Sequence, residues 1–204
     1  MATIVLINKP YHMLCQFTDK DNRPTLADIK TLHKFNNFYP AGRLDFDSEG
    51  LIVLTNNGAL QHHISHPDHK LSKTYWVQVE GAVDKGALAK LSRGIELKDG
   101  LTKPAKAKAI SLPKLWDRYP PIRERQNIPT SWLELTINEG KNRQVRRMTA
   151  AVGYPTLRLI RARIGSWALN GLQPGEIRVE QAHLPRSSNS TKSNSRNKRS
   201  RAQR

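Results

Sequence analysis

Three acidic side chains stand close together in residues 40–58, and each could take part in chemistry: Asp45, Asp47 and Glu49. Their spacing copies the start of a calcium-binding loop. Position twelve of such a loop must be a bidentate glutamate, and here it is Asn56, so we exclude calcium. Arg43 could contact a phosphate, and a carboxylate beside it could act as a nucleophile or a base. The alternative is that Asp45 only forms a structural salt bridge or caps a loop.

Four histidines crowd into the segment HHISHPDH, at positions 62, 63, 66 and 69. A metal site there is conceivable, because imidazole is a common metal ligand. However, His62 and His63 point to different sides of any regular element, and Asp68 is the only acidic residue nearby. Histidines that face solvent or RNA are the favoured interpretation, and we expect no metal.

A second basic motif, INEGKNRQVRRM, covers residues 137–148 and enters a predicted helix. On that helix Arg143 and Arg147 lie on the polar face, and Arg146 lies at the boundary of the buried face. A boundary arginine can hold a partly buried carboxylate through a bidentate pair. The alternative is an arginine that reaches into solvent.

The charge of the whole chain favours a polyanionic partner. The 204 residues include 34 Lys and Arg against 17 Asp and Glu, a formal net charge of +17. Residues 186–204 hold seven basic and no acidic side chains, so residues 1–185 still carry +10. RNA, DNA and membrane surfaces are the common cellular polyanions. A charge that serves solubility alone is the other interpretation.

Other functions lose support from what the sequence lacks. A single cysteine, Cys15, excludes an intramolecular disulfide and a cysteine-based metal site, and indicates a reducing compartment. The apolar run near the N-terminus is too short to span a bilayer, so we expect a soluble, cytoplasmic protein without membrane contact. Glycine-rich phosphate loops and the zinc-protease and serine-hydrolase motifs do not occur.

The elements that must position these residues alternate irregularly along the chain. Apolar patterning predicts strands at residues 2–8, 51–55, 73–80, 104–112, 131–138 and 156–167. It predicts helices at residues 25–35, 58–66, 84–94 and 141–152. Because this is not the regular alternation of a parallel sheet, we expect an α+β fold with a mixed, mostly antiparallel sheet. Residues 113–129 read as an irregular basic loop. Residues 186–204 read as a disordered basic tail that either binds polyanions or has no partner.

Four segments together resemble the RsuA-type pseudouridine synthases in order and spacing. They are NKP at 8–10, AGRLDFDSEGLIVLTNNG at 41–58, SKTYWV at 72–77 and EGKNRQVRRM at 139–148, extended by RLIRARIG at 158–165 and LQPGEIR at 172–178. The resemblance implies the pseudouridine synthase fold over about residues 1–185. It also implies that the chain isomerises a uridine in structured RNA, with large-subunit (23S) ribosomal RNA as the expected partner.

The same resemblance implies roles for individual residues. Asp45 would be the catalytic nucleophile, Tyr75 would stack on the flipped base and remove its C5 proton, and Arg146 would pair with Asp45. Arg43 would displace the target nucleotide, and Leu159 or Ile160 would line the base pocket. The residues that we expect to contact RNA are Arg43, Lys9, Lys73, Arg143, Arg147 and Leu159.

The resemblance also sets what we do not expect. Most members carry an S4-like RNA-binding module before the catalytic domain, and here the first catalytic strand begins at about Thr3, so we expect no such module. The isomerisation needs no redox cofactor, and we expect a monomer. A non-catalytic RNA-binding or ribosome-assembly protein is the alternative function. It explains the charge but leaves Asp45 and Tyr75 without a purpose.

Overall fold

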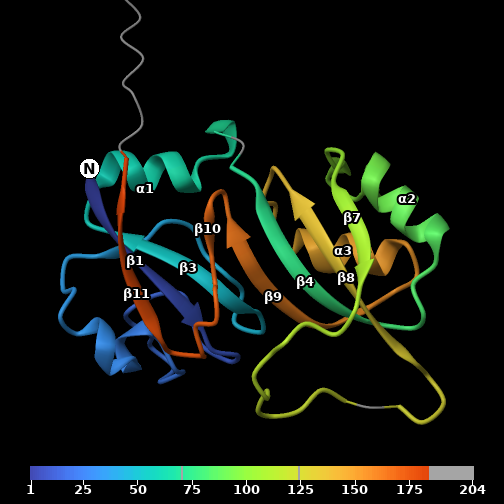
Figure 1. Ribbon diagram of the computed structural model, residues 1–204, viewed down its shortest axis with the longest axis horizontal. Coiled ribbons are helices and arrows are strands. Elements are labelled where there is room, and N and C mark those ends of the chain that lie inside the picture. The colour runs from blue at the N-terminus through green and yellow to red at the C-terminus, as the bar shows by residue number, and fades with distance from the viewer. Residues whose placement is uncertain (70, 124, 184–204) are drawn as a thin grey trace, which may run out of the picture.

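One large mixed sheet forms the centre of the molecule (Figure 1). The computed structural model describes residues 1–69, 71–123 and 125–183. The strands are β1 (Ala2–Lys9), β2 (Tyr39–Pro40), β3 (Glu49–Thr55), β4 (Lys73–Glu80), β5 (Glu96–Leu97), β6 (Gly100–Leu101), β7 (Lys106–Ile110), β8 (Thr130–Ile137), β9 (Thr156–Ile164), β10 (Trp167–Ala168) and β11 (Ile177–Ala182). The helices are α1 (Gly58–Ser65), α2 (Lys85–Arg93) and α3 (Gln144–Ala151), with short 3-10 turns η1 (Leu26–Asp28), η2 (Lys30–Leu32) and η3 (Pro67–His69).

The strand order across the sheet is β11-β1-β3-β9-β4-β8-β7. Every pair along this path is antiparallel except β3 and β9, which run parallel over a short stretch. This arrangement confirms the expected α+β fold with a mixed, mostly antiparallel sheet. The sheet therefore has two halves, β11-β1-β3 and β4-β8-β7, that meet at β9 (Figure 1).

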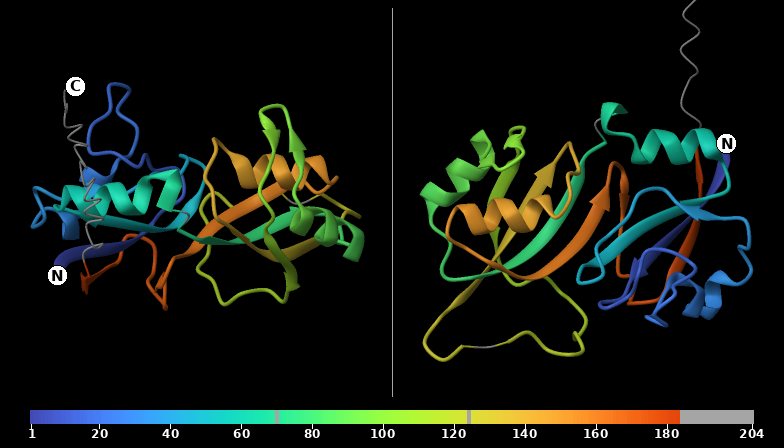
Figure 2. Two further views of the ribbon diagram at one scale, coloured as in Figure 1. Left: turned by 90° about the horizontal axis from the view of Figure 1, so that it is seen from above. Right: turned by 180° about the vertical axis from the view of Figure 1, so that it is seen from behind.

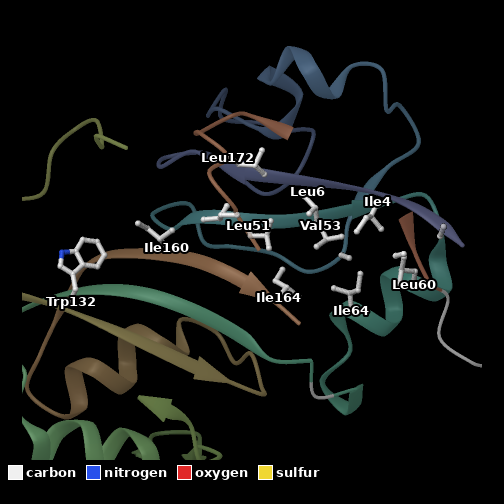
Figure 3. Packing of buried hydrophobic residues seen from close by; sticks show 14 residues of the cluster. Ile4, Leu6, Leu51, Val53, Leu60, Ile64, Trp132, Ile160, Ile164 and Leu172 are labelled. Atoms are coloured by element: carbon white, nitrogen blue, oxygen red, sulfur yellow. The ribbon is translucent and has the colours of Figure 1, made fainter. Parts of the chain in front are cut away.

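Each half of the sheet is covered differently. In strand β1 the apolar side chains alternate between two faces, so that Ile4 and Leu6 pack with α1, whereas Val5 and Ile7 pack with η1 and η2. Figure 3 shows Leu60 and Ile64 of α1 beside Ile4 and Val53 of the sheet. In the other half, α2 and α3 pack on one face of β4 and β8, as the view from behind in Figure 2 shows.

The seam between the halves requires a glycine. In the parallel pairing of β3 and β9, Gly50 lies opposite Arg161, and its φ is +108°. A Cβ atom built on Gly50 would lie 2.4 Å from the carbonyl oxygen of Arg161, which is closer than any side chain can approach. Only glycine therefore allows β3 and β9 to pair directly after the acidic segment.

Most predicted elements form, and the exceptions have clear causes. The predicted helix at residues 25–35 is wrong, because this segment forms the turns η1 and η2 instead. Its apolar side chains at 26, 29 and 32 are spaced by three, which also matches the three residues per turn of a 3-10 helix. Helix α3 begins at Gln144, three residues later than predicted. Strand β11 is an element that the apolar pattern does not predict, since only Ala182 of its six residues is buried.

Two expectations lie at the limits of the structure. The basic tail at residues 186–204 lies outside the described residues. Within the described residues, no helix has the length and apolar character that are needed to cross a membrane.

Candidate active site

A cleft opens where the two halves of the sheet meet, and it encloses about 320 Å³. Its walls come from the acidic segment after β2, from β4 and β9, and from the turn before α3. Asp45 enters from one half of the sheet and Tyr75 from the other, so the cleft brings together two residues that lie 30 positions apart. The Asp45 side chain is 33% exposed, whereas Tyr75 is 7% exposed and packs in the core beneath the cleft.

A buried arginine holds the segment that carries Asp45. Arg161 Nε donates to the carbonyl of Leu51 at 2.8 Å, and its Nη1 donates to the carbonyl of Arg43 at 3.2 Å. The amide of Ser48 donates to the carbonyl of Asp45 at 3.1 Å, which closes a tight turn. Because Arg161 itself is 3% exposed, these bonds are shielded from water and fix the position of the loop.

The two aspartates of this loop have different partners. Asp47 accepts a bidentate pair from Arg143, with distances of 2.9 and 2.8 Å, and its carbonyl accepts from Arg146 Nη2 at 2.6 Å. Among the residues that the structure describes, Asp45 has only one cation within 4 Å, Arg143, at 3.7 Å. The predicted pair between Arg146 and Asp45 is therefore wrong in this conformation. Arg143 precedes α3 in a left-handed conformation, with φ of +46°, and so it turns toward the aspartates instead of lying on the helix.

Charge and burial shift the pKa values around Asp47. Burial by itself raises the pKa of Asp47, but the hydrogen bond from Arg143 and the charge of Arg146 outweigh it, and the pKa is lowered. Burial lowers the pKa of Arg146, and Asp47 opposes that effect. Asp47 is therefore the ionised structural partner of both arginines, and the carboxylate of Asp45 is left accessible from the cleft.

Five further predicted residues line the same cleft: Arg43, Lys73, Arg143, Leu159 and Tyr75. Arg147 is not part of the lining, and its guanidinium pairs with Asp99 at 2.6 Å. Ile160, the alternative to Leu159, is fully buried in the core and is not part of the lining.

Lys9 is not available to RNA, and the prediction that it binds RNA is wrong. The residue is 0% exposed, and its ammonium donates to the carbonyls of Pro10 and Met13 at 2.8 and 2.7 Å. Burial lowers the pKa of Lys9 to about 8. Lys9 therefore stabilises the turn after β1.

The four histidine rings of this segment pack against one another: the rings of His62 and His66 stack with centroids 4.6 Å apart, and the tilted rings of His63 and His69 have centroids 4.4 Å apart. Among the described residues, no group of three or more side chains has the arrangement of a metal site. The segment does reach the cleft, since Ile64 and Ser65 of α1 line it.

The comparisons with known proteins agree with this geometry. A family model described as RNA pseudouridylate synthase matches residues 3–151. The chain belongs to this family. It is 56% identical over 173 residues to ribosomal large subunit pseudouridine synthase E of Vibrio parahaemolyticus, covering 85% of this chain and 71% of that protein. It is 51% identical over 187 residues to the protein of the same name from Xanthomonas campestris, covering 90% and 98%.

A solved structure supports the same assignment. A crystal structure of a pseudouridylate synthase has 31% sequence identity and a TM-score of 0.71, and the match covers 89% of this chain and 71% of that chain. A human RNA pseudouridylate synthase domain protein, at 16% identity and a TM-score of 0.52, shares the fold. The pseudouridine synthase fold is therefore shown for this member of the family.

The basic loop of this pseudouridine synthase, residues 113–129, is held in place by contacts that the sequence pattern did not indicate. Glu49, the third acidic side chain of residues 40–58, pairs with Arg158 at 2.8 Å and accepts from Trp116 Nε1 at 2.7 Å. The same loop places the Arg118 guanidinium 4.2 Å from the ring centroid of Tyr11. That ring begins a stack that continues through His12 to Phe46, the neighbour of Asp45. The loop is thus attached at two points to the segment that carries Asp45.

We expect the substitution Glu49→Ala to lower the free energy of unfolding by about 3–5 kcal/mol, because it leaves Arg158 buried and uncompensated. Urea unfolding followed by circular dichroism measures this change. The double variant Glu49→Leu, Arg158→Met removes both charges and should lose less than the single variant. A single variant within about 1 kcal/mol of the wild type would contradict the prediction, since that is the range of an exposed pair.

Proposed function

We propose that this chain converts a uridine of large-subunit (23S) ribosomal RNA to pseudouridine, with Asp45 as the group that acts on the sugar. One observation carries the proposal: an accessible carboxylate, Asp45, lies in a cleft lined by Tyr75 and by several cations. The carboxylate repels phosphate, so it has no use in RNA binding alone. It has a use once an extruded nucleotide brings its sugar carbon into the cleft.

The reaction breaks the bond between C1′ and N1, turns the uracil, and joins C1′ to C5. The C5 proton leaves and N1 gains a proton, so nothing is oxidised or reduced. The uridine must first leave its stack, which costs a few kcal/mol. Phosphate contacts from exposed cations at the rim, Arg43 and Arg143, offset that cost. Tyr75 removes the C5 proton.

Ribosomal RNA is the substrate that the relatives favour. The two proteins named ribosomal large subunit pseudouridine synthase E share more than half of their matched residues with this chain. A net charge of +17 suits a structured polyanion. We further propose that residues 1–185 form the catalytic domain, that residues 186–204 add loose RNA contacts, and that the protein acts in the cytoplasm as a monomer.

The proposal is tested with a large-subunit rRNA transcript labelled with tritium at C5 of uridine. We expect the purified chain, without added metal, to release about one equivalent of tritium and to leave the RNA chain intact. Mapping of pseudouridine in the product should give a single position. Binding of the transcript without any tritium release from it, or from assembling large subunits, would favour the non-catalytic alternative.

A further inference from the structure

Arg161 and Lys73 line the cleft, are buried or half-buried, and have no carboxylate partner among the described residues. Arg161 is 3% exposed, and its Nη2 atom is buried without a hydrogen-bond acceptor. Lys73 is half-buried, and its ammonium donates only to the carbonyl of Leu71, at 3.1 Å. The nearby aspartates are occupied elsewhere, since Asp47 binds Arg143. Buried cations without a counter-ion are unfavourable unless an anion joins them.

The two cations lie close to the same part of the cleft. In the pairing of β4 with β9, Arg161 lies opposite Tyr75. Lys73 is two residues before Tyr75 on β4, so the two side chains project from the same face of that strand. Burial and the charge of Arg161 both lower the pKa of Lys73, as expected for two cations that line one cleft. An anion bound between them would relieve the repulsion between the two charges.

We propose that Lys73 and Arg161 form an anion site that holds the detached uracil during the isomerisation. This inference rests on the proposed function. When the C1′–N1 bond breaks, its electron pair leaves with the uracil, whose negative charge spreads over N1 and the carbonyl oxygens. This holds whether Asp45 bonds to C1′ or removes a proton from the sugar. Donors that face the developing charge stabilise the transition state.

Burial decides between the uracil and a phosphate as the bound anion. The cations at the rim, Arg43 and Arg143, are the more exposed, and they are the ones that backbone phosphates reach first. Arg161 lies at the floor, opposite Tyr75, where only the deepest part of an extruded nucleotide arrives. The uracil returns to the sugar through C5, so a site that binds its anion also keeps it in the cleft while it turns.

The test uses Lys73→Met, because Arg161 also holds the loop through two carbonyls. Single-turnover rates are measured on RNA that carries uridine or 5-fluorouridine at the target position. The RNA is digested to nucleosides at each time point, and the rate is taken from the loss of the original nucleoside. Fluorine withdraws electrons and stabilises the departing anion. We expect Lys73→Met to slow the step about 100-fold on uridine and less than about tenfold on 5-fluorouridine. RNA affinity should change little, and Lys73→Arg should restore much of the rate.

The matched control is Lys108→Met. Lys108 of β7 pairs with Glu134 of β8, and neither residue lines the cleft. The control substitution should leave both rates unchanged. Equal slowing of Lys73→Met on both substrates would overturn the anion site, and so would weaker RNA binding with an unchanged chemical step, which indicates a phosphate contact. In both cases the wild type still converts uridine, so the proposed function stands. A wild type that converts no uridine refutes the proposed function itself.

Discussion

The substitution Asp45→Asn should lower the rate of pseudouridine formation by more than about 10⁴-fold, the scale seen when a reacting side chain is removed. The amide keeps the shape of the side chain but cannot bond to C1′ or accept a proton from the sugar. RNA affinity should stay within a few fold or rise slightly, because the change removes a negative charge from a cationic cleft. Tritium release from RNA labelled at C5 measures the rate, and filter binding measures the affinity.

The matched control for this prediction is Asp47→Asn, two residues further along the same loop. It changes the charge equally but removes a half-exposed ion pair with Arg143, which contributes about 1 kcal/mol or less. We expect this variant to keep a readily measured turnover. If Asp45→Asn and Asp47→Asn lose activity equally, the assignment of the reacting carboxylate is refuted.

The substitution Tyr75→Phe should slow product formation by about 10²- to 10⁴-fold, the usual contribution of a positioned general base. The ring remains, so stacking on the base and packing in the core are retained. If the hydroxyl removes the C5 proton, that proton transfer becomes the slowest step in the variant. A substrate with deuterium at C5 should then show a larger isotope effect than it does with the wild type.

Tyr154→Phe provides the control, because Tyr154 does not line the cleft. Its hydroxyl donates to Asp84 at a distance of 2.9 Å. This variant should release tritium at the wild-type rate. Equal turnover in Tyr75→Phe would assign the proton transfer to another group and leave Tyr75 as a stacking residue only.

Much of the fold could be predicted from apolar patterning. The strands β1, β3, β4 and β8 carry continuous or alternating apolar side chains, and the structure has all of them. The segment of η1 and η2 could not be assigned in the same way. A spacing of three between Leu26, Ile29 and Leu32 suits an α-helix or a 3-10 helix, and the extended backbone at Ile29 decides the outcome.

The candidate site was predicted less completely, for two physical reasons. The helical pattern placed Arg143 on the polar face of α3, but the helix begins after it, so the geometry of a single turn determines which arginine meets which aspartate. Patterning also treats a charge as exposed. Glu49, Arg158 and Arg161 are buried because they satisfy one another or the backbone, and only the three-dimensional contacts reveal this.

The short parallel seam between β3 and β9 places Asp45 on one side of a line through the sheet and Tyr75 on the other. Two ion pairs cross this line, Arg143 with Asp47 and Arg158 with Glu49. These pairs therefore help to set the separation of Asp45 and Tyr75. An RNA that fills the cleft must fit this fixed separation, so we expect selection among RNA folds to take place at the seam.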